Sequence, residues 1–278
     1  MSFSAYLKEI GRGAQGSRPL SEDQAYQLMS AMLDAGVPDL EMGALLIALR
    51  MKGESLEELL GFYQAMDERL YRISLPGNGP RPVVIPTYNG ARRQANLTPL
   101  LALWLKQFGI PVLLHGTLES HGRVGTAYVL RELDILPCAS TSQAASQLAT
   151  QRIAFVPTNV LSPGLTSLLN VRSRLGVRNT AHTLVKLIEP FDGDGLRMIS
   201  VSHPDYLRLL SDFFAATGME ALLMRGTEGE PYANPKRRPD IMHFRDGQAT
   251  QLFEAETGPI SSLPTLPEAA DAATTAAW

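Results

Sequence analysis

The sequence predicts an α/β protein made of a small N-terminal helical domain and an α/β domain with a mostly parallel sheet. Two observations indicate this fold class. The first 73 residues carry helix-start signals and helical apolar spacing, whereas strand and helix patterns alternate after a proline- and glycine-rich linker at 75–80. The chain has 278 residues, of which 45% are hydrophobic, so it can bury a core in each part.

The N-terminal helices are predicted by their first residues. Ser21 and Ser55 begin capping boxes that are completed three residues later by Gln24 and Glu58. Another helix is expected to begin at Asp39, and acidic residues gather in these first turns, where the helix dipole favours them. We therefore expect four short helices in this part.

Short apolar runs that alternate with helical patterns predict the elements of the second part. The expected strands are 83–86, 111–115, 153–157, 197–202 and 221–225, followed by a hairpin of 241–244 and 250–254. The expected helices are 97–108, 123–133, 142–150 and 204–217. A helical segment at 163–188 interrupts the alternation, so we expect the helical domain to comprise 1–73 joined by about 161–189, and the α/β domain 81–278. The last six residues resemble a helix that stops without a cap, so we expect the natural protein to be longer.

The loop after the first predicted strand, 83–86, has an unusual composition for its position. In a parallel sheet this loop lies at the carboxyl edge, where ligands bind. Loops that bind phosphate there usually offer the backbone N–H groups of glycines. This loop contains Gly90 as its one glycine, together with Arg92 and Arg93. We therefore expect it to bind phosphate through side-chain charge.

Charge is distributed unevenly along the chain. Between Arg81 and Arg178 there are ten basic and three acidic residues, a net charge of +7, whereas the whole chain carries −3 and the remainder therefore −10. Such asymmetry can create a local positive field that the overall charge conceals. An even scatter of these cations over a solvated surface is the alternative interpretation.

A second basic loop is predicted at Pro235–Pro239, which holds the consecutive cations Lys236, Arg237 and Arg238. The flanking prolines exclude a helix interior, so the segment is expected to be a rigid, exposed loop. It follows the predicted strand 221–225 and should lie at the same edge of the sheet as the arginines of the first loop. A plain solvated run of charge is the alternative.

Other function classes lack their sequence signals. The single Cys138 excludes an internal disulfide and is typical of a reducing compartment, and no apolar run has membrane-spanning length, so we expect a cytoplasmic protein. The glycine-rich nucleotide-binding motifs are absent. The five histidines do not have metal-ligand spacing, and we predict no metal site and no cofactor.

The order of these segments resembles anthranilate phosphoribosyltransferase over about residues 5 to 245. The matching positions are Asn96, Thr98, His115, Gly116, Arg172 and Arg178. The resemblance implies that Asn96 and Thr98 belong to a segment that binds the ribose-phosphate donor with its magnesium, and that Arg172 contacts anthranilate. From the residues alone, a structural role for His115 is the alternative.

Departures from that family affect its catalytic parts. Pro86–Arg93 replaces its G-T-G-G-D pyrophosphate loop, Leu114 and Thr117 replace two residues of its K-H-G-N segment, and Pro231-Tyr232 falls where a paired Asp-Glu should hold the second magnesium. These departures imply a backbone that cannot close around a pyrophosphate and a magnesium ion without its oxygen ligands. We therefore expect no catalytic residues and no magnesium-dependent binding of phosphoribosyl pyrophosphate.

Four longer segments resemble a narrower family, the YbiB branch of this superfamily: EIGRG, IPTYNGARRQANLTPLL, VSHPDY and MRGTEGEPYANP. The resemblance implies a homodimer that binds nucleic acid without sequence preference. We expect DNA or RNA to be bound through phosphate contacts in a groove between the two domains. The predicted contacts are Arg92, Arg93, Lys236, Arg237 and Arg238, with Arg172 and Arg178 as secondary contacts.

Two alternatives and one assembly prediction complete this interpretation. The first alternative is a residual phosphoribosyltransferase that uses Asn96, Thr98, His115 and Arg172, and the second is a scaffold whose groove binds an acidic protein. A homodimer is expected through the N-terminal helices, which carry more apolar positions than one small bundle would bury. The apolar positions that suggest this interface are Leu40, Met42, Leu46 and Phe62.

Overall fold

The computed structural model describes residues 2–13, 15–75, 79–119, 122–192, 195–260 and 262–278. The chain divides into a helical unit, Met1–Leu70 with Ser162–Ile188, and an α/β unit, Tyr71–Leu161 with Glu189–Trp278. The sequence-based boundaries were 1–73 with about 161–189, and 81–278. Residues 76–78 of the predicted linker lie outside the described residues.

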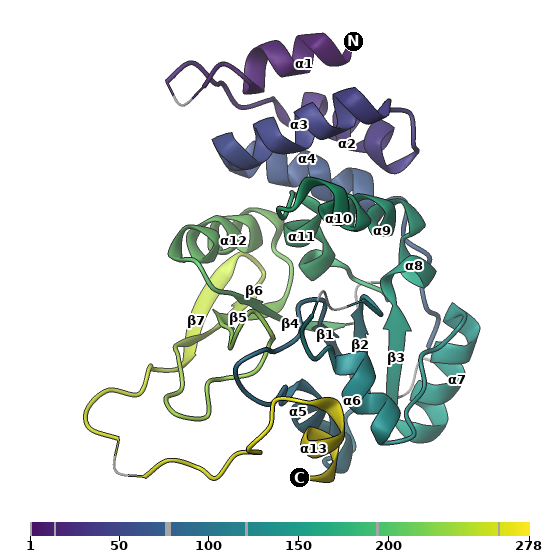
Figure 1. Ribbon diagram of the computed structural model, residues 1–278, viewed down its shortest axis with the longest axis vertical. Helices are drawn as coiled ribbons and strands as arrows, with labels where there is room; N and C mark the ends of the chain where they lie inside the picture. The colour runs from purple at the N-terminus through teal and green to yellow at the C-terminus, as the bar shows by residue number, and fades with distance from the viewer. Residues whose placement is uncertain (1, 14, 76–78, 120–121, 193–194, 261) are drawn as a thin grey trace. The chain divides into compact units, whose positions relative to one another are not determined.

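The helical unit contains the four expected N-terminal helices and the shorter helices of the second segment (Figure 1). They are α1 (Phe3–Ile10), α2 (Glu22–Leu33), α3 (Asp39–Lys52), α4 (Leu56–Asp67), α9 (Pro163–Asn170), α10 (Arg172–Leu175), α11 (Ala181–Leu184) and the 3₁₀ turn η1 (Val185–Leu187). Both predicted capping boxes are confirmed: Ser21 caps α2 with Gln24, and Ser55 caps α4 with Glu58. Local sequence signals therefore determine where these helices begin.

The exposed apolar surface of the helical unit differs from the predicted one. Leu46 and Phe62 are buried in this core, and Met42 is only partly exposed. The exposed apolar positions lie instead along one stripe of α3, where Leu40 is 82% and Met51 79% exposed. With Ala44 and Ile47 between them, these side chains follow helical spacing, so the exposed stripe belongs to one helix and not to several faces of the bundle.

The α/β unit is built on a seven-stranded sheet with the order β3-β2-β1-β4-β5-β6-β7. The strands are β1 (Val83–Pro86), β2 (Val112–Gly116), β3 (Ile153–Pro157), β4 (Leu196–Val201), β5 (Ala221–Arg225), β6 (Ile241–Arg245) and β7 (Gln248–Phe253). The first five are parallel, whereas β6 and β7 are antiparallel. The prediction of a mostly parallel sheet with a terminal hairpin is confirmed.

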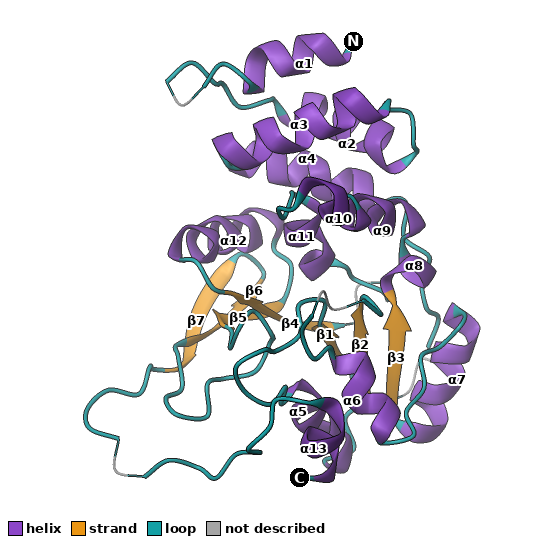
Figure 2. Ribbon diagram, viewed as in Figure 1, coloured by secondary structure: helices purple, strands orange, loops and turns teal. Residues whose placement is uncertain are grey.

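The four helices predicted at 97–108, 123–133, 142–150 and 204–217, together with two shorter ones, accompany this sheet (Figures 1 and 2). They are α5 (Thr98–Gln107), α6 (Thr126–Glu132), α7 (Thr141–Gln151), α8 (Thr158–Leu161), α12 (Pro204–Thr217) and α13 (Ala272–Ala277). Residues of β1, β2 and β3 pack against α5 and α6 in one apolar core. The C-terminal segment leaves β7, has no helix or strand at 254–260 and 262–271, and returns to α6, where α13 packs.

The strand order places two loops at the same edge of the sheet. The chain proceeds from β1 outward through β2 and β3 and then resumes at β4 on the other side of β1. The carboxyl ends of strands at such a switch point form the usual ligand-binding crevice of open α/β sheets. The loops that follow β1 and β5 both begin at this edge. In the described part of the chain, no helix combines the length and the apolar character needed to cross a membrane.

Candidate nucleic-acid interface

The loop after β1 and the loop after β5 are joined by hydrogen bonds from backbone to carboxylate. The N–H groups of Arg92 and Arg93 donate to the two carboxylate oxygens of Glu228, at 3.0 and 2.9 Å. Glu228 therefore contacts the backbone of these two residues and, within the described ranges, forms no ion pair with their guanidinium groups. Arg92 and Arg93 are exposed, and neither side chain has a hydrogen-bond or ion-pair partner within the described ranges.

A second carboxylate, that of Glu230, lies fully buried inside the first loop. Its Oε1 accepts the N–H groups of Asn89 and Gly90, at 3.0 and 2.7 Å. Its Oε2 accepts the hydroxyl groups of Thr87, Thr98 (3.1 Å) and Thr126 (3.4 Å). These donors belong to three separate segments of the chain, so Glu230 holds the loop to the starts of α5 and α6.

The residues that match the donor-binding segment belong to the hydrogen-bond network around the buried carboxylate of Glu230. Asn96 donates from Nδ2 to the hydroxyl of Thr126 at 3.1 Å and accepts from the N–H of Thr98 at 3.1 Å. The hydroxyl of Thr98 in turn donates to Glu230. Asn96 and Thr98 are both fully buried. Their polar groups are therefore engaged in an internal network.

His115 and Gly116 are placed at the end of β2, where they have packing roles. His115 is fully buried, neither ring nitrogen has a hydrogen-bond partner among the described residues, and burial lowers the pKa of its imidazole to about 3. Gly116 lies so close to the first loop that a Cβ atom would come within 1.8 Å of the carbonyl oxygen of Thr87. The end of β2 therefore holds a neutral histidine and a glycine that permits close approach of the backbone of the first loop.

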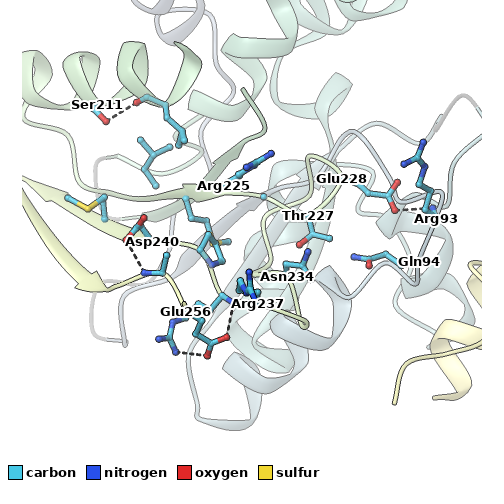
Figure 3. Close-up of a pocket in the computed structure, with 18 residues that line it drawn as sticks. Arg93, Gln94, Ser211, Arg225, Thr227, Glu228, Asn234, Arg237, Asp240 and Glu256 are labelled. Carbon is cyan, nitrogen blue, oxygen red and sulfur yellow. Dashed lines mark hydrogen bonds and ion pairs between the residues drawn. The ribbon is translucent and has the colours of Figure 1, made fainter. Parts of the chain in front are cut away.

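Arg93 of the first loop and Arg237 and Arg238 of the second border a pocket of about 780 Å³ within the α/β unit (Figure 3). Figure 3 shows Arg93 and Glu228 on one side of this pocket and Arg237 and Glu256 on the other. Its charged lining residues are Arg93, Arg225, Glu228, Arg237, Arg238, Asp240 and Glu256. The structure thus brings together cations that are far apart in the sequence.

The three cations of the second loop differ in how firmly they are held. Lys236 is exposed, and its ammonium group has no partner in the described segments. Arg237 donates to the carbonyl oxygen of Gly258 at 2.7 Å. Arg238 is fixed most firmly, because it pairs with Glu256 at 3.5 Å and stacks over the ring of Phe253 at 5.3 Å. Of the three, Lys236 has the most freely available charge.

Two of the predicted contacts belong to the other unit, and one cation of the pocket was not predicted. Arg172 and Arg178 belong to the helical unit and do not line this pocket. Arg225, the last residue of β5, is exposed, lines the pocket and has no partner in the described part of the chain. Its place at the carboxyl end of a predicted strand was the signal that could have identified it.

Several known proteins are similar to this chain in sequence. Residues 4–70 match the family model of the glycosyl transferase family helical bundle domain. Anthranilate phosphoribosyltransferase from Synechocystis is 29% identical over 88% of this chain and 72% of its own length. The Escherichia coli (strain K12) protein YbiB is 47% identical over the whole chain and 87% of its own length. The chain belongs to the YbiB family of the anthranilate phosphoribosyltransferase superfamily. This relationship confirms the resemblance inferred from the sequence.

The fold of this YbiB-type chain also matches solved structures. Anthranilate phosphoribosyltransferase from Thermus thermophilus superimposes with a TM-score of 0.74 over 94% of this chain and 78% of its own, at 23% identity. The Saccharomyces cerevisiae enzyme, solved with PRPP and Mg, gives a TM-score of 0.71 over 90% of this chain and 72% of its own. These matches establish a phosphoribosyltransferase-like fold.

The carboxylates near the predicted magnesium position do not fit the role of metal ligands. Pro231 and Tyr232 are buried, and the preceding Glu228 and Glu230 each use both oxygens to accept protein hydrogen bonds. Within the described ranges, no group of three or more histidine, cysteine, aspartate or glutamate residues is placed to hold a metal ion. Sequence reasoning missed these two glutamates because it looked for an adjacent Asp-Glu pair.

Proposed function

We propose that this protein binds nucleic acid without sequence preference, through phosphate contacts of the two basic loops of the α/β unit. The observation that carries the proposal is a group of exposed cations without protein partners in the described part of the chain, on the two basic loops and at the end of β5, of which Arg93 and Arg225 line the pocket. These cations are Arg92, Arg93, Arg225 and Lys236. Cations that are not neutralised by the protein are available for phosphate oxygens, which supply most of the affinity in sequence-independent binding.

The pocket itself supports contacts to phosphate more than contacts to bases. None of its described lining residues is aromatic, whereas proteins that stack bases offer aromatic side chains. The three acidic side chains of the pocket are also engaged: Glu228 by backbone N–H groups, Glu256 by Arg238, and Asp240 by the side chain of Gln251 and the N–H of Ala255. Their negative charge is thereby partly compensated, which favours an approaching polyanion.

The transferase alternative receives less support from this geometry. Asn96 and Thr98, the matches to the donor-binding segment, are hydrogen-bonded within the protein. His115 is fully buried, and its lowered pKa leaves no protonated imidazole near pH 7. Three of the four residues that this alternative requires are therefore engaged or enclosed.

The salt dependence of binding tests the proposal. Each phosphate that is neutralised on duplex DNA releases counterions, which lowers the slope of log K against log salt by about 0.9. If five or six cations make contact, the expected slope is roughly −5. Fluorescence anisotropy with two unrelated 30-base-pair duplexes, titrated at several salt concentrations, measures it. A slope near zero, or strong preference for one duplex in competition, would contradict sequence-blind phosphate binding.

We also propose that the protein is a homodimer through α3. The support is the exposed stripe of Leu40, Ala44, Ile47 and Met51, since a continuous exposed apolar stripe is typical of an interface. A twofold assembly is the commonest closed arrangement and would present two copies of the basic loops to one nucleic-acid strand. Longer strands should then bind more tightly than short ones.

Light scattering at micromolar concentration checks the assembly. The wild-type protein is expected at twice its chain mass, and the double variant Leu40→Glu with Met51→Glu at its chain mass, because two charges per chain would be buried at the interface. Phe108→Glu serves as the control, since Phe108 is equally exposed (82%) but lies on the α/β unit. A monomeric wild type, or a double variant that still dimerises, would refute an α3 interface.

A further inference from the structure

The buried carboxylate of Glu230 is surrounded in the way that proteins surround a bound oxyanion. Two consecutive backbone N–H groups and three hydroxyl groups point at its two oxygens. No ion pair involving Glu230 occurs within the described part of the chain. Its charge is therefore stabilised by hydrogen-bond donors alone. Consecutive backbone N–H groups that converge in this manner form a typical anion-binding concavity.

The first loop has no backbone donor left between Asn89 and Arg93. Asn89 and Gly90 donate to Glu230, and Arg92 and Arg93 donate to Glu228. The remaining N–H group, that of Ala91, donates to the carbonyl oxygen of Val124 at 3.0 Å. Two carboxylates of the protein thus use the donors that a phosphate would otherwise use.

A tight turn between Thr227 and Glu230 positions the carboxylates of Glu228 and Glu230. Thr227 and Glu230 exchange backbone hydrogen bonds of 3.1 and 2.9 Å, and the two residues between them have positive φ angles, +53° for Glu228 and +90° for Gly229. This is the pattern of a two-residue hairpin turn in which both central residues are left-handed. A glutamate in that conformation is strained, so its contacts with the first loop must hold it there.

We propose that Glu230 is an internal ligand that occupies a built phosphate site in the loop after β1. The site is suited to a phosphate-sized oxyanion, and the protein's own carboxylate excludes such anions from it. The nucleic acid of the proposed function would contact the outward-pointing arginine side chains, whereas this site uses the inward-pointing backbone. Either proposal can therefore be refuted without refuting the other.

Removing the carboxylate tests this assignment. In Glu230→Ala, two backbone N–H groups and three hydroxyls lose their acceptor, so a lower Tm than that of wild type is expected in chloride buffer. Inorganic phosphate, titrated at constant ionic strength, should then raise the Tm of this variant by several degrees in a saturable manner. Isothermal calorimetry with inorganic phosphate should show one site per chain in the variant and none in wild type.

Two further variants make the result specific. Glu254→Ala removes an exposed carboxylate of the same unit and should respond to phosphate as wild type does. Glu230→Gln keeps a side-chain oxygen for Asn89 and Gly90 and keeps the site filled, so it should fold without a phosphate response. If Glu230→Ala is unfolded in chloride, phosphate should restore its helical circular dichroism.

Three outcomes would overturn the proposal. The first is a folded Glu230→Ala that shows no phosphate-specific stabilisation. The second is an unfolded Glu230→Ala that phosphate does not restore while Glu230→Gln folds normally. The third is a wild-type protein that binds inorganic phosphate, or phosphoribosyl pyrophosphate with Mg²⁺, at this loop with micromolar affinity, because the site would then be open in the presence of Glu230.

Discussion

Replacing Arg92, Arg93 and Lys236 together by glutamine is expected to weaken nucleic-acid binding by about 10²- to 10³-fold at 0.1 M salt. Each of these side chains is exposed, and none has a protein partner in the described part of the chain, so their loss should leave the fold intact. Each lost phosphate contact makes the slope of log K against log salt shallower by about 0.9. It also removes the favourable free energy of the counterions that this contact would have released. The slope should therefore become shallower by about 3.

The matched control removes the same charge from the same unit. Arg131, Arg208 and Arg245 are exposed, lie outside both basic loops and do not line the pocket. Their joint replacement by glutamine lowers the net charge equally but should change affinity only slightly, since no defined contact is lost. Anisotropy titrations of both triple variants at several salt concentrations distinguish the two cases. Equal losses in the two variants would indicate a general charge effect and would contradict a site at the two loops.

Replacing His115 by leucine is expected to reduce the acid sensitivity of the fold. Burial lowers the pKa of His115 from 6.5 to about 3, so between these values the unfolded chain binds a proton that the folded protein does not. The free energy of unfolding therefore falls as the pH falls through this window, by about 1.4 kcal/mol per pH unit once the pH is well below 6.5. The leucine variant lacks this contribution.

Urea unfolding at pH 6.5 and at pH 4.5 measures this effect. The wild type should lose about 2 kcal/mol more between these two values than the His115→Leu variant, as proton linkage at a single group requires. Leucine has a volume close to that of histidine, so packing changes should affect both pH values alike. An identical pH dependence in the two proteins would show that the imidazole is protonated in the folded state at pH 4.5.

Elements with local signals could be predicted from the sequence. The capping boxes at Ser21 and Ser55, the parallel strands and the hairpin near Asp246-Gly247 were predicted close to their observed positions, because caps, apolar periodicity and turn residues act over a few residues. Burial was harder to predict. Leu46 and Phe62 carry the same apolar character as Leu40, and only the packing of the bundle decides which of them is exposed.

The network around Glu230 could not be predicted in this way. Its donors, Asn89 and Thr126, are 141 and 104 residues away in the chain, and the relevant glutamate is one of many in a typical turn sequence. The scarcity of glycines suggested that the backbone could not surround an anion. The structure shows that the backbone does so, with a carboxylate of the protein as the anion. Tethering of Arg238 by Glu256 is likewise a tertiary contact without a local signal.

The division of the helical unit into two chain segments has a consequence for the order of folding during synthesis. Gly164, at the start of α9, lies directly against the backbone of Leu33 at the end of α2, so the N-terminal bundle is completed only after α9 has been synthesised. The central strand pair of the sheet likewise joins Val83 to Leu196. Neither unit can therefore complete its fold until later parts of the chain have been synthesised, and long loops must close before either unit is stable. A ribosome that has made only the first 160 residues carries helices and strands whose apolar faces still lack their final partners, which is when chaperones protect a nascent chain.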